Sequence, residues 1–258
     1  MQCKIISLFL VTCIVSCNDG TPHYNATAMF VYKKKISAGY ANTVGDILLP
    51  VNYLRVSQAS GDFGNFLRGI ELNPDGTVYL FNGQKKVNQQ AQFAVLKVTV
   101  GDTDLQQCAD AIMRLRATFL FEQKNFEQIA FVDNAQTLYT FKAPHTKQNL
   151  EVFLKKVFSM CGTASLSKQL KGRLMKDIMP GDVLIRGGFP GHAVIVMDVA
   201  VNENNEKVFL LAQSYMPAQQ IHILKNTKND FSPWYTLTND VDIITPEYHF
   251  KNTELKTW

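Results

Sequence analysis

Four short apolar segments in the last third of the chain constrain the fold more than any other feature. They read DVLIR, HAVIVMDVAV, EKVFLLAQSY and QQIHIL, and they lie between Asp182 and Leu224. Short runs rich in β-branched and aromatic residues, bounded by Gly, Asn and Pro, are typical of buried strands. Asn202–Asn205 separates the second segment from the third and predicts a hairpin turn. We therefore expect an antiparallel sheet in this part of the chain.

Two helices are expected before these strands. TDLQQCADAIMRLRATFLFEQ and TKQNLEVFLKKVFSMCG each carry one apolar stripe with spacings of three and four, which indicates a helix with one buried face. The start of the first helix has two interpretations. Thr103 and Gln106 can form a capping box, or the helix begins nearer Gln106. Gly162 is expected to end the second helix.

The first third of the chain reads as strand-rich. GDILLPV, GTVYLF and FAVLKVTV are β-type runs separated by turn signals, and a short helix is expected in GDFGNFLRGIEL. Strands followed by helices and again by strands predict an α+β fold, with helices packed on a mostly antiparallel sheet. We expect one domain over residues 28–258, with a β-rich part at 28–100 and a core at 101–258.

The N-terminus reads as a processing signal. Lys4 precedes the apolar run Ile5–Val15, which is too short to span a bilayer and fits a signal peptide over residues 1–16. The end of the run, Ser16-Cys17, resembles the lipobox of bacterial lipoproteins, which implies a lipid on Cys17. A secretory signal with a chance cysteine is the alternative. Residues 17–27 are polar and read as a tether, so we expect a protein of the cell envelope that is anchored to a membrane through its lipid.

Several function classes find no support in the sequence. No His, Cys, Asp and Glu cluster has metal-ligand spacing, and neither an HExxH nor a GxSxG motif occurs. The formal net charge of +4 is too small and too scattered to indicate nucleic-acid binding. We expect no metal, no cofactor and no nucleic-acid partner.

The candidate chemistry lies on a cysteine and a histidine. A cysteine attacks carbonyl groups as a thiolate, which a helix N-terminus or a nearby imidazolium favours. Cys108 lies near the start of a helix, although its place on the apolar stripe also fits core packing. Cys161 lies at a helix C-terminus, where the dipole disfavours a thiolate, so we expect it in the core. The two cysteines could instead form a disulfide.

His192 is the best base candidate because it opens a strand directly after the glycine-rich turn GGFPG. A histidine can accept a thiol proton and later return it to a leaving group, provided that a third polar group orients its ring. His222, inside a strand, is a weaker candidate. If the hairpin loop has an even number of residues, Gln213 shares a face of the sheet with His192; an odd loop places Gln213 on the opposite face.

Two resemblances bear on the function. FLRGIELNPDG, LQQCADAIMRLRA, PGHAVIVMDVA and LLAQSYMPAQQIHIL resemble a family of Bacteroidota lipoproteins described as domain of unknown function 4846, which implies a compartment but no activity. QCADAIMRLRA, GDVLIRGGFPGHAVIVMDVA and FLLAQS are similar to the NlpC-type cell-wall peptidases of the papain-like superfamily.

The second resemblance implies a papain-like core in which Cys108 is the nucleophile, His192 the base and Gln213 the orienting group. It implies a cysteine hydrolase that cleaves an amide bond, most plausibly in peptidoglycan peptides. An acyltransferase or a lipid esterase on the same fold is an alternative. A non-catalytic binding or scaffold lipoprotein of the envelope is another.

Overall fold

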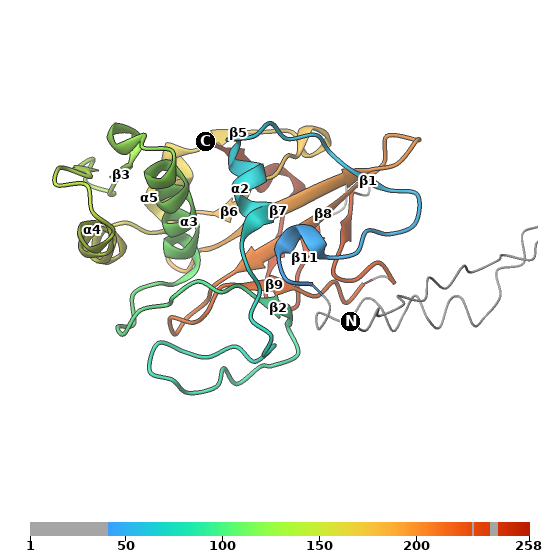
Figure 1. The fold of residues 1–258 in the computed structure, drawn as a ribbon, viewed down its shortest axis with the longest axis horizontal. Coiled ribbons are helices and arrows are strands. Elements are labelled where there is room, and N and C mark those ends of the chain that lie inside the picture. Colours follow the sequence, from blue (N-terminus) through green and yellow to red (C-terminus); the bar gives the residue numbers. More distant parts are fainter. Residues whose placement is uncertain (1–40, 229, 238–241) are drawn as a thin grey trace, which may run out of the picture. The chain divides into compact units, whose positions relative to one another are not determined.

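Helices pack on one large antiparallel sheet in the computed structural model, which describes residues 41–228, 230–237 and 242–258 (Figure 1). The expected signal peptide, the lipidated Cys17 and the tether lie outside the described residues. Within these ranges, the sheet confirms the α+β class with mostly antiparallel pairing. None of the helices in this part of the chain is both long enough and apolar enough to cross a membrane.

The main sheet has a continuous path of seven strands with two short strands beside it. In spatial order the path runs β2 (Gln92–Val95), β9 (His222–Leu224), β8 (Lys207–Gln213), β7 (His192–Val201), β6 (Val183–Arg186), β13 (Leu255–Thr257) and β5 (Lys171–Gly172). The short strands are β1 (Leu54–Arg55), which pairs with β7, and β10 (Tyr235–Thr236), which pairs with β8. Two separate hairpins are formed by β3 (Ala130–Val132) with β4 (Leu138–Thr140), and by β11 (Ile243–Ile244) with β12 (His249–Phe250).

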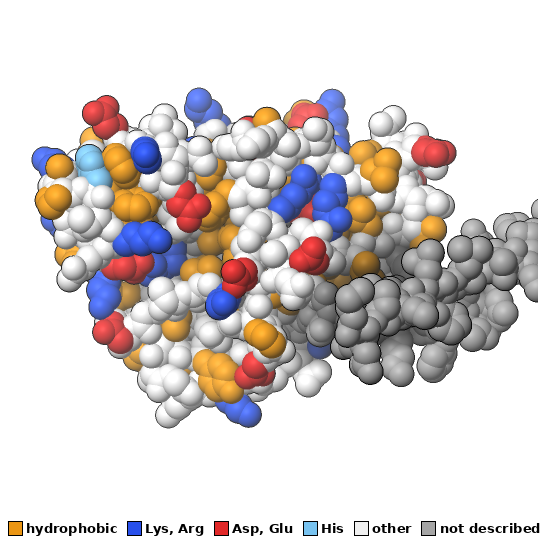
Figure 2. All heavy atoms as spheres, viewed as in Figure 1, with side chains coloured by type: hydrophobic (Ala, Val, Ile, Leu, Met, Phe, Trp, Pro, Cys, Tyr) orange, Lys and Arg blue, Asp and Glu red, His pale blue; other side chains and the backbone are white. Residues whose placement is uncertain are grey.

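Four α-helices are present in the described ranges: α2 (Phe63–Gly69), α3 (Cys108–Glu122), α4 (Lys147–Met160) and α5 (Thr163–Gln169). Single 3-10 turns lie at Val44–Asp46, Phe126–Gln128, Met175–Asp177 and Asn252–Glu254. Both α2 and α3 contact β7, and α3 also contacts β8 (Figure 1). On the face shown in Figure 2, acidic and basic side chains are interspersed.

The helices and the later strands match the sequence-based expectations with two additions. Thr146 caps α4 by accepting a hydrogen bond from the backbone N–H of Asn149 at 3.1 Å. Gly162 ends this helical segment as expected, but α5 begins at the next residue and was not predicted. Its seven residues are too few to show a clear apolar period.

The β-rich reading of the first third was largely wrong. GTVYLF forms only the isolated bridges of Tyr79 with Lys85 and of Leu80 with Gln219, and GDILLPV forms no strand. In both segments the backbone bonds to side chains and to loop backbone; for example, the Lys86 N–H donates to the Val78 carbonyl at 2.9 Å. The Leu48 carbonyl accepts a hydrogen bond from Trp234 Nε1 at 2.7 Å, and Gln89 Nε2 donates to the Val78 carbonyl at 2.9 Å. FAVLKVTV does contribute β2, although only as far as Val95.

A β-bulge in β7 changes the register of the central hairpin. Near the turn, Val201 pairs with Lys207, so the loop has five residues, which is an odd number. Beyond the bulge, Val196 pairs with Leu211, because β7 contains one extra residue at Met197. A shift of one residue exchanges the two faces of a strand. At the start of β7, residues therefore share a face of the sheet with the same residues of β8 as they would if the loop had an even number of residues.

Asp198, at the same bulge, is completely buried and binds two arginines. Its carboxylate oxygens accept hydrogen bonds from Arg55 Nε and Arg68 Nε, each at 2.6 Å. Arg55 also donates to the Ile47 carbonyl, and Arg68 to the Val56 carbonyl. This cluster ties the residues before α3 to the central strand of the sheet.

Removing the Asp198 charge should destabilise the protein strongly, because two largely buried guanidinium groups lose their common partner. We expect Asp198→Asn to lower the free energy of unfolding by about 3 kcal/mol, or the Tm by roughly 10 °C, in thermal and urea unfolding. Glu71→Gln is the matched control, since the Glu71–Lys97 pair has side-chain exposures of 64% and 62%. It should leave the free energy of unfolding nearly unchanged, because solvent screens this exposed pair. Equal losses in the two variants would contradict the structural role of Asp198.

Candidate active site

Cys108 is the first residue of α3. A helix that started at Thr103 would have placed Cys108 in its second turn instead. The expected capping box at Thr103 was wrong. Gln107 precedes the helix instead, and its backbone N–H donates to Asp110 Oδ2 at 3.0 Å. The first turn of a helix is where the dipole stabilises a negative charge. The interpretation that starts the helix near Gln106 is therefore the correct one.

The Cys108 sulfur lies against the beginning of β7. Burial, and to a smaller extent the nearby Asp110, raise the pKa of its thiol to about 11, although hydrogen bonds from the backbone N–H groups of Ala109, Ala193 and Cys108 act in the opposite direction. Ala193 directly follows His192 in the chain. The sulfur of Cys108 is thus within hydrogen-bond reach of the peptide that joins these two residues.

His192 opens β7 and is 2% exposed. The glycine turn before it packs tightly on α5, and a side chain at Gly191 would meet Thr163 Oγ1 at 2.3 Å and the Arg186 carbonyl at 2.6 Å. The rings of Tyr215 and Tyr248 lie 4.6 and 4.7 Å from the imidazole, between ring centroids. Burial lowers the pKa of His192 to about 4, although the hydrogen bond to Gln213 and the charge of Glu247 raise it. The imidazole is therefore neutral at physiological pH.

Gln213 is the last residue of β8, and its side chain meets His192 directly. The Oε1 atom of Gln213 lies 2.8 Å from Nε2 of His192, and both side chains are buried. The five-residue loop alone would put them on opposite faces of the sheet. The bulge at Met197 reverses the register between the loop and the site, and it thereby brings Gln213 to the face of His192.

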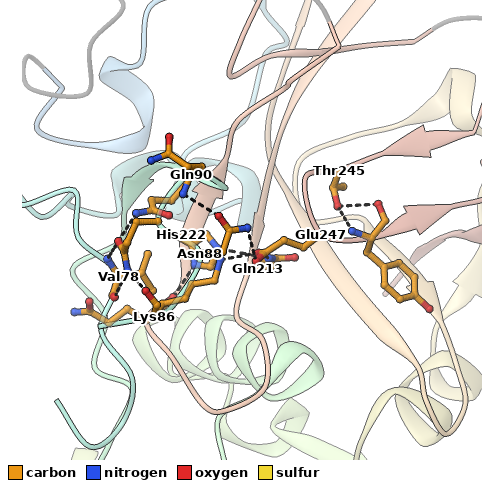
Figure 3. A network of polar contacts seen from close by, with 12 residues as sticks. Val78, Lys86, Asn88, Gln90, Gln213, His222, Thr245 and Glu247 are labelled. Carbon is orange, nitrogen blue, oxygen red and sulfur yellow. Dashed lines mark hydrogen bonds and ion pairs between the residues drawn. The ribbon is translucent and has the colours of Figure 1, made fainter. Parts of the chain in front are cut away.

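Three polar residues behind Gln213 were missed or underrated by the sequence analysis. Gln213 Nε2 donates to Glu247 Oε2 at 2.7 Å and lies 3.5 Å from His222 Nε2 (Figure 3). Glu247 also forms an ion pair with Lys86 at 2.7 Å. Glu247 lies in the turn between β11 and β12, and Lys86 comes from the segment before β2. Neither residue belongs to a recognisable motif, because 161 positions of sequence separate them.

Cys161 and the Gly181-Asp182 pair have roles in packing and in a turn. Cys161 and Cys108 are both free, so no disulfide links them. Burial raises the pKa of Cys161 to about 11, with the Asp133 and Asp110 carboxylates adding to it. In the Gly-Asp pair before β6, Gly181 has a φ of +92°, and Asp182 Oδ2 accepts a hydrogen bond from the Met179 backbone at 2.8 Å. That pair forms a turn.

No group of three His, Cys, Asp or Glu side chains in the described ranges is placed to hold a metal ion. The polar groups that the structure does bring together, namely His192, Gln213, Glu247, Lys86 and His222, form one hydrogen-bonded chain. A half-buried thiol at a helix start, within hydrogen-bond reach of the backbone N–H that follows an oriented histidine, is an arrangement that nucleophilic catalysis uses.

Comparisons with known proteins give a family and no activity. The family model of the domain of unknown function 4846 matches residues 45–143 and 132–257. Neither the curated proteins nor the solved structures contain a match to this chain. Because the two matched ranges cover most of the sequence, the chain belongs to the family described as domain of unknown function 4846.

Proposed function

We propose that this protein is an envelope-anchored cysteine hydrolase that cleaves an amide bond, most plausibly in peptidoglycan peptides. The observation that carries the proposal is the hydrogen bond of 2.8 Å between His192 and Gln213. Cys108 begins a helix, and its sulfur lies within hydrogen-bond reach of the Ala193 backbone N–H, next to His192 in the chain. Cys108 is the nucleophile, His192 the base and Gln213 the residue that orients the imidazole. The similarity to NlpC-type peptidases adds the papain-like core and the class of substrate.

The reaction needs only these groups and water. As the Cys108 sulfur bonds to the carbonyl carbon of the substrate, its proton passes to His192. The imidazolium then gives this proton to the departing amine when the C–N bond breaks, which leaves an acyl-enzyme thioester. Water attacks the thioester, His192 takes one proton from it, and the thiol regains that proton as the acid is released. The backbone N–H of Cys108 is a donor available to the developing oxyanion.

The pKa values of Cys108 and His192 favour a neutral thiol and a neutral imidazole before substrate binds. With the pKa of Cys108 near 11 and that of His192 near 4, the thiol is protonated and the imidazole is neutral between these values. His192 in this form has a free nitrogen lone pair and can act as a base. Proton transfer therefore accompanies the attack and does not precede it.

Cleavage of peptide cross-links should depend on one of the two cysteines of the described fold. We expect the soluble domain to release new amino groups and carboxylates from purified peptidoglycan, detected by mass spectrometry of the products. Cys108→Ala should reduce the rate by at least about 10³-fold, since it removes the nucleophile. Cys161→Ala is the matched control and should keep the activity. A peptidoglycan that stays intact with wild-type protein, while short acyl esters are cleaved, would favour the esterase alternative.

The pH dependence of thiol alkylation tests the role of His192. With iodoacetamide, we expect Cys108 to react at a nearly constant rate above pH about 5 and to slow as His192 becomes protonated near pH 4. His192→Ala should lower the rate at pH 7 by about 10²-fold and leave a rate that rises tenfold per pH unit, as the thiolate fraction does. Cys161 serves as the internal reference. Equal, slow labelling of both cysteines in the wild-type protein would support a non-catalytic binding protein.

A further inference from the structure

We infer that Glu247 and His222 hold the amide of Gln213 in one orientation, and that this orientation fixes the proton of His192 on Nε2. Glu247 thereby acts as a positioning residue of the candidate site. The catalytic consequence rests on the proposed hydrolase function, whereas the proton position is a property of the folded protein alone.

The orientation of Gln213 follows from what its neighbours can accept. Glu247 Oε2 lies 2.7 Å from the amide nitrogen, and an ionised carboxylate has no proton to donate. The amide atom that faces Glu247 must therefore be the NH₂ group. With the amide turned over, its carbonyl oxygen would face a carboxylate oxygen, and neither of these two atoms could donate to the other.

His222 restrains the same NH₂ group from a second side. Its Nδ1 lies 2.9 Å from the Gln220 carbonyl oxygen, which only accepts, so Nδ1 carries the proton. Burial, together with the nearby charge of Lys86, lowers the pKa of His222 to about 3, so the ring is neutral. Its Nε2 therefore presents a lone pair to Gln213 Nε2 at 3.5 Å. Both neighbours of the Gln213 nitrogen are acceptors.

The carbonyl oxygen of Gln213 consequently faces His192. Because that oxygen can only accept, the atom 2.8 Å away, His192 Nε2, must carry the ring proton. The lone pair of the neutral imidazole is then on Nδ1. A base that receives the Cys108 proton needs such a free lone pair, so the network behind Gln213 selects the tautomer that is ready to react.

Glu247 is itself held on both of its oxygens. Lys86 Nζ donates to Oε2 at 2.7 Å and Asn88 Nδ2 to Oε1 at 3.1 Å (Figure 3). Lys86 is 7% exposed, and its charge balances that of Glu247. Glu247 also lies in the turn closed by Thr245 and Tyr248, and the Tyr248 ring packs on His192. The turn thus reaches the imidazole directly and through Gln213.

The double variant Lys86→Met/Glu247→Leu removes the acceptor beside Gln213 without leaving an unpaired buried charge, and replacing both partners with apolar residues is commonly tolerated. We expect the ¹⁵N spectrum of His192 to change from one tautomer to a mixture, and alkylation of Cys108 by iodoacetamide to slow by about 10- to 100-fold. Glu247→Gln is the matched variant. Its carbonyl oxygen can still accept from Gln213, so it should keep the wild-type tautomer.

The wild-type spectrum provides a test that needs no substitution. His192 should carry its proton on Nε2 and His222 on Nδ1. A wild-type His192 with its proton on Nδ1, or an unchanged tautomer in the double variant, would overturn the inference. If the tautomer changes and the labelling rate of Cys108 does not, the positioning role holds and the proposed hydrolase mechanism fails.

Discussion

The register change at Met197 is the constraint on which the arrangement of this fold depends. The five-residue loop would place His192 and Gln213 on opposite faces of the sheet, and one extra residue in β7 reverses that relation. The bulge also turns Asp198 toward Arg55 and Arg68, which hold it with two hydrogen bonds of 2.6 Å. A single irregularity therefore aligns the candidate site and anchors the segments before α3. Bulges that re-aim a side chain are frequent next to active sites.

Burial determines the chemistry that the site can perform. His192 is surrounded by Tyr215, Tyr248 and Phe250 and is nearly inaccessible to water. Burial of this kind disfavours charge, so it lowers the pKa of the imidazole and raises that of the Cys108 thiol. A resting thiolate–imidazolium pair is disfavoured here. The hydrogen bond between His192 and Gln213 then matters chiefly for the position of a proton on a neutral ring.

The sequence was informative where the signal is local. The stripe around Cys108, the apolar run after His192 and the asparagines at 202–205 each predicted an element that the structure contains. The parity argument for Gln213 left both faces open, and with the five-residue loop it gives the wrong face. The bulge, which no residue type announces, reverses that relation. Of the strands expected in the first third, FAVLKVTV contributes β2, whereas GDILLPV and GTVYLF bond to side chains and loop backbone and form no regular strand.

The long-range part of the site lay beyond sequence reasoning for a physical reason. A buried ion pair between Lys86 and Glu247 has no spacing rule, because it joins a loop before β2 to the turn of the β11–β12 hairpin, 161 positions apart. A single aspartate within the apolar run of β7 was a usable sign, since a buried charge requires a partner. The residues before α3 supply Lys86 behind Gln213 and two arginines at the bulge. The residues before α3 therefore belong to the same compact unit as those that follow it.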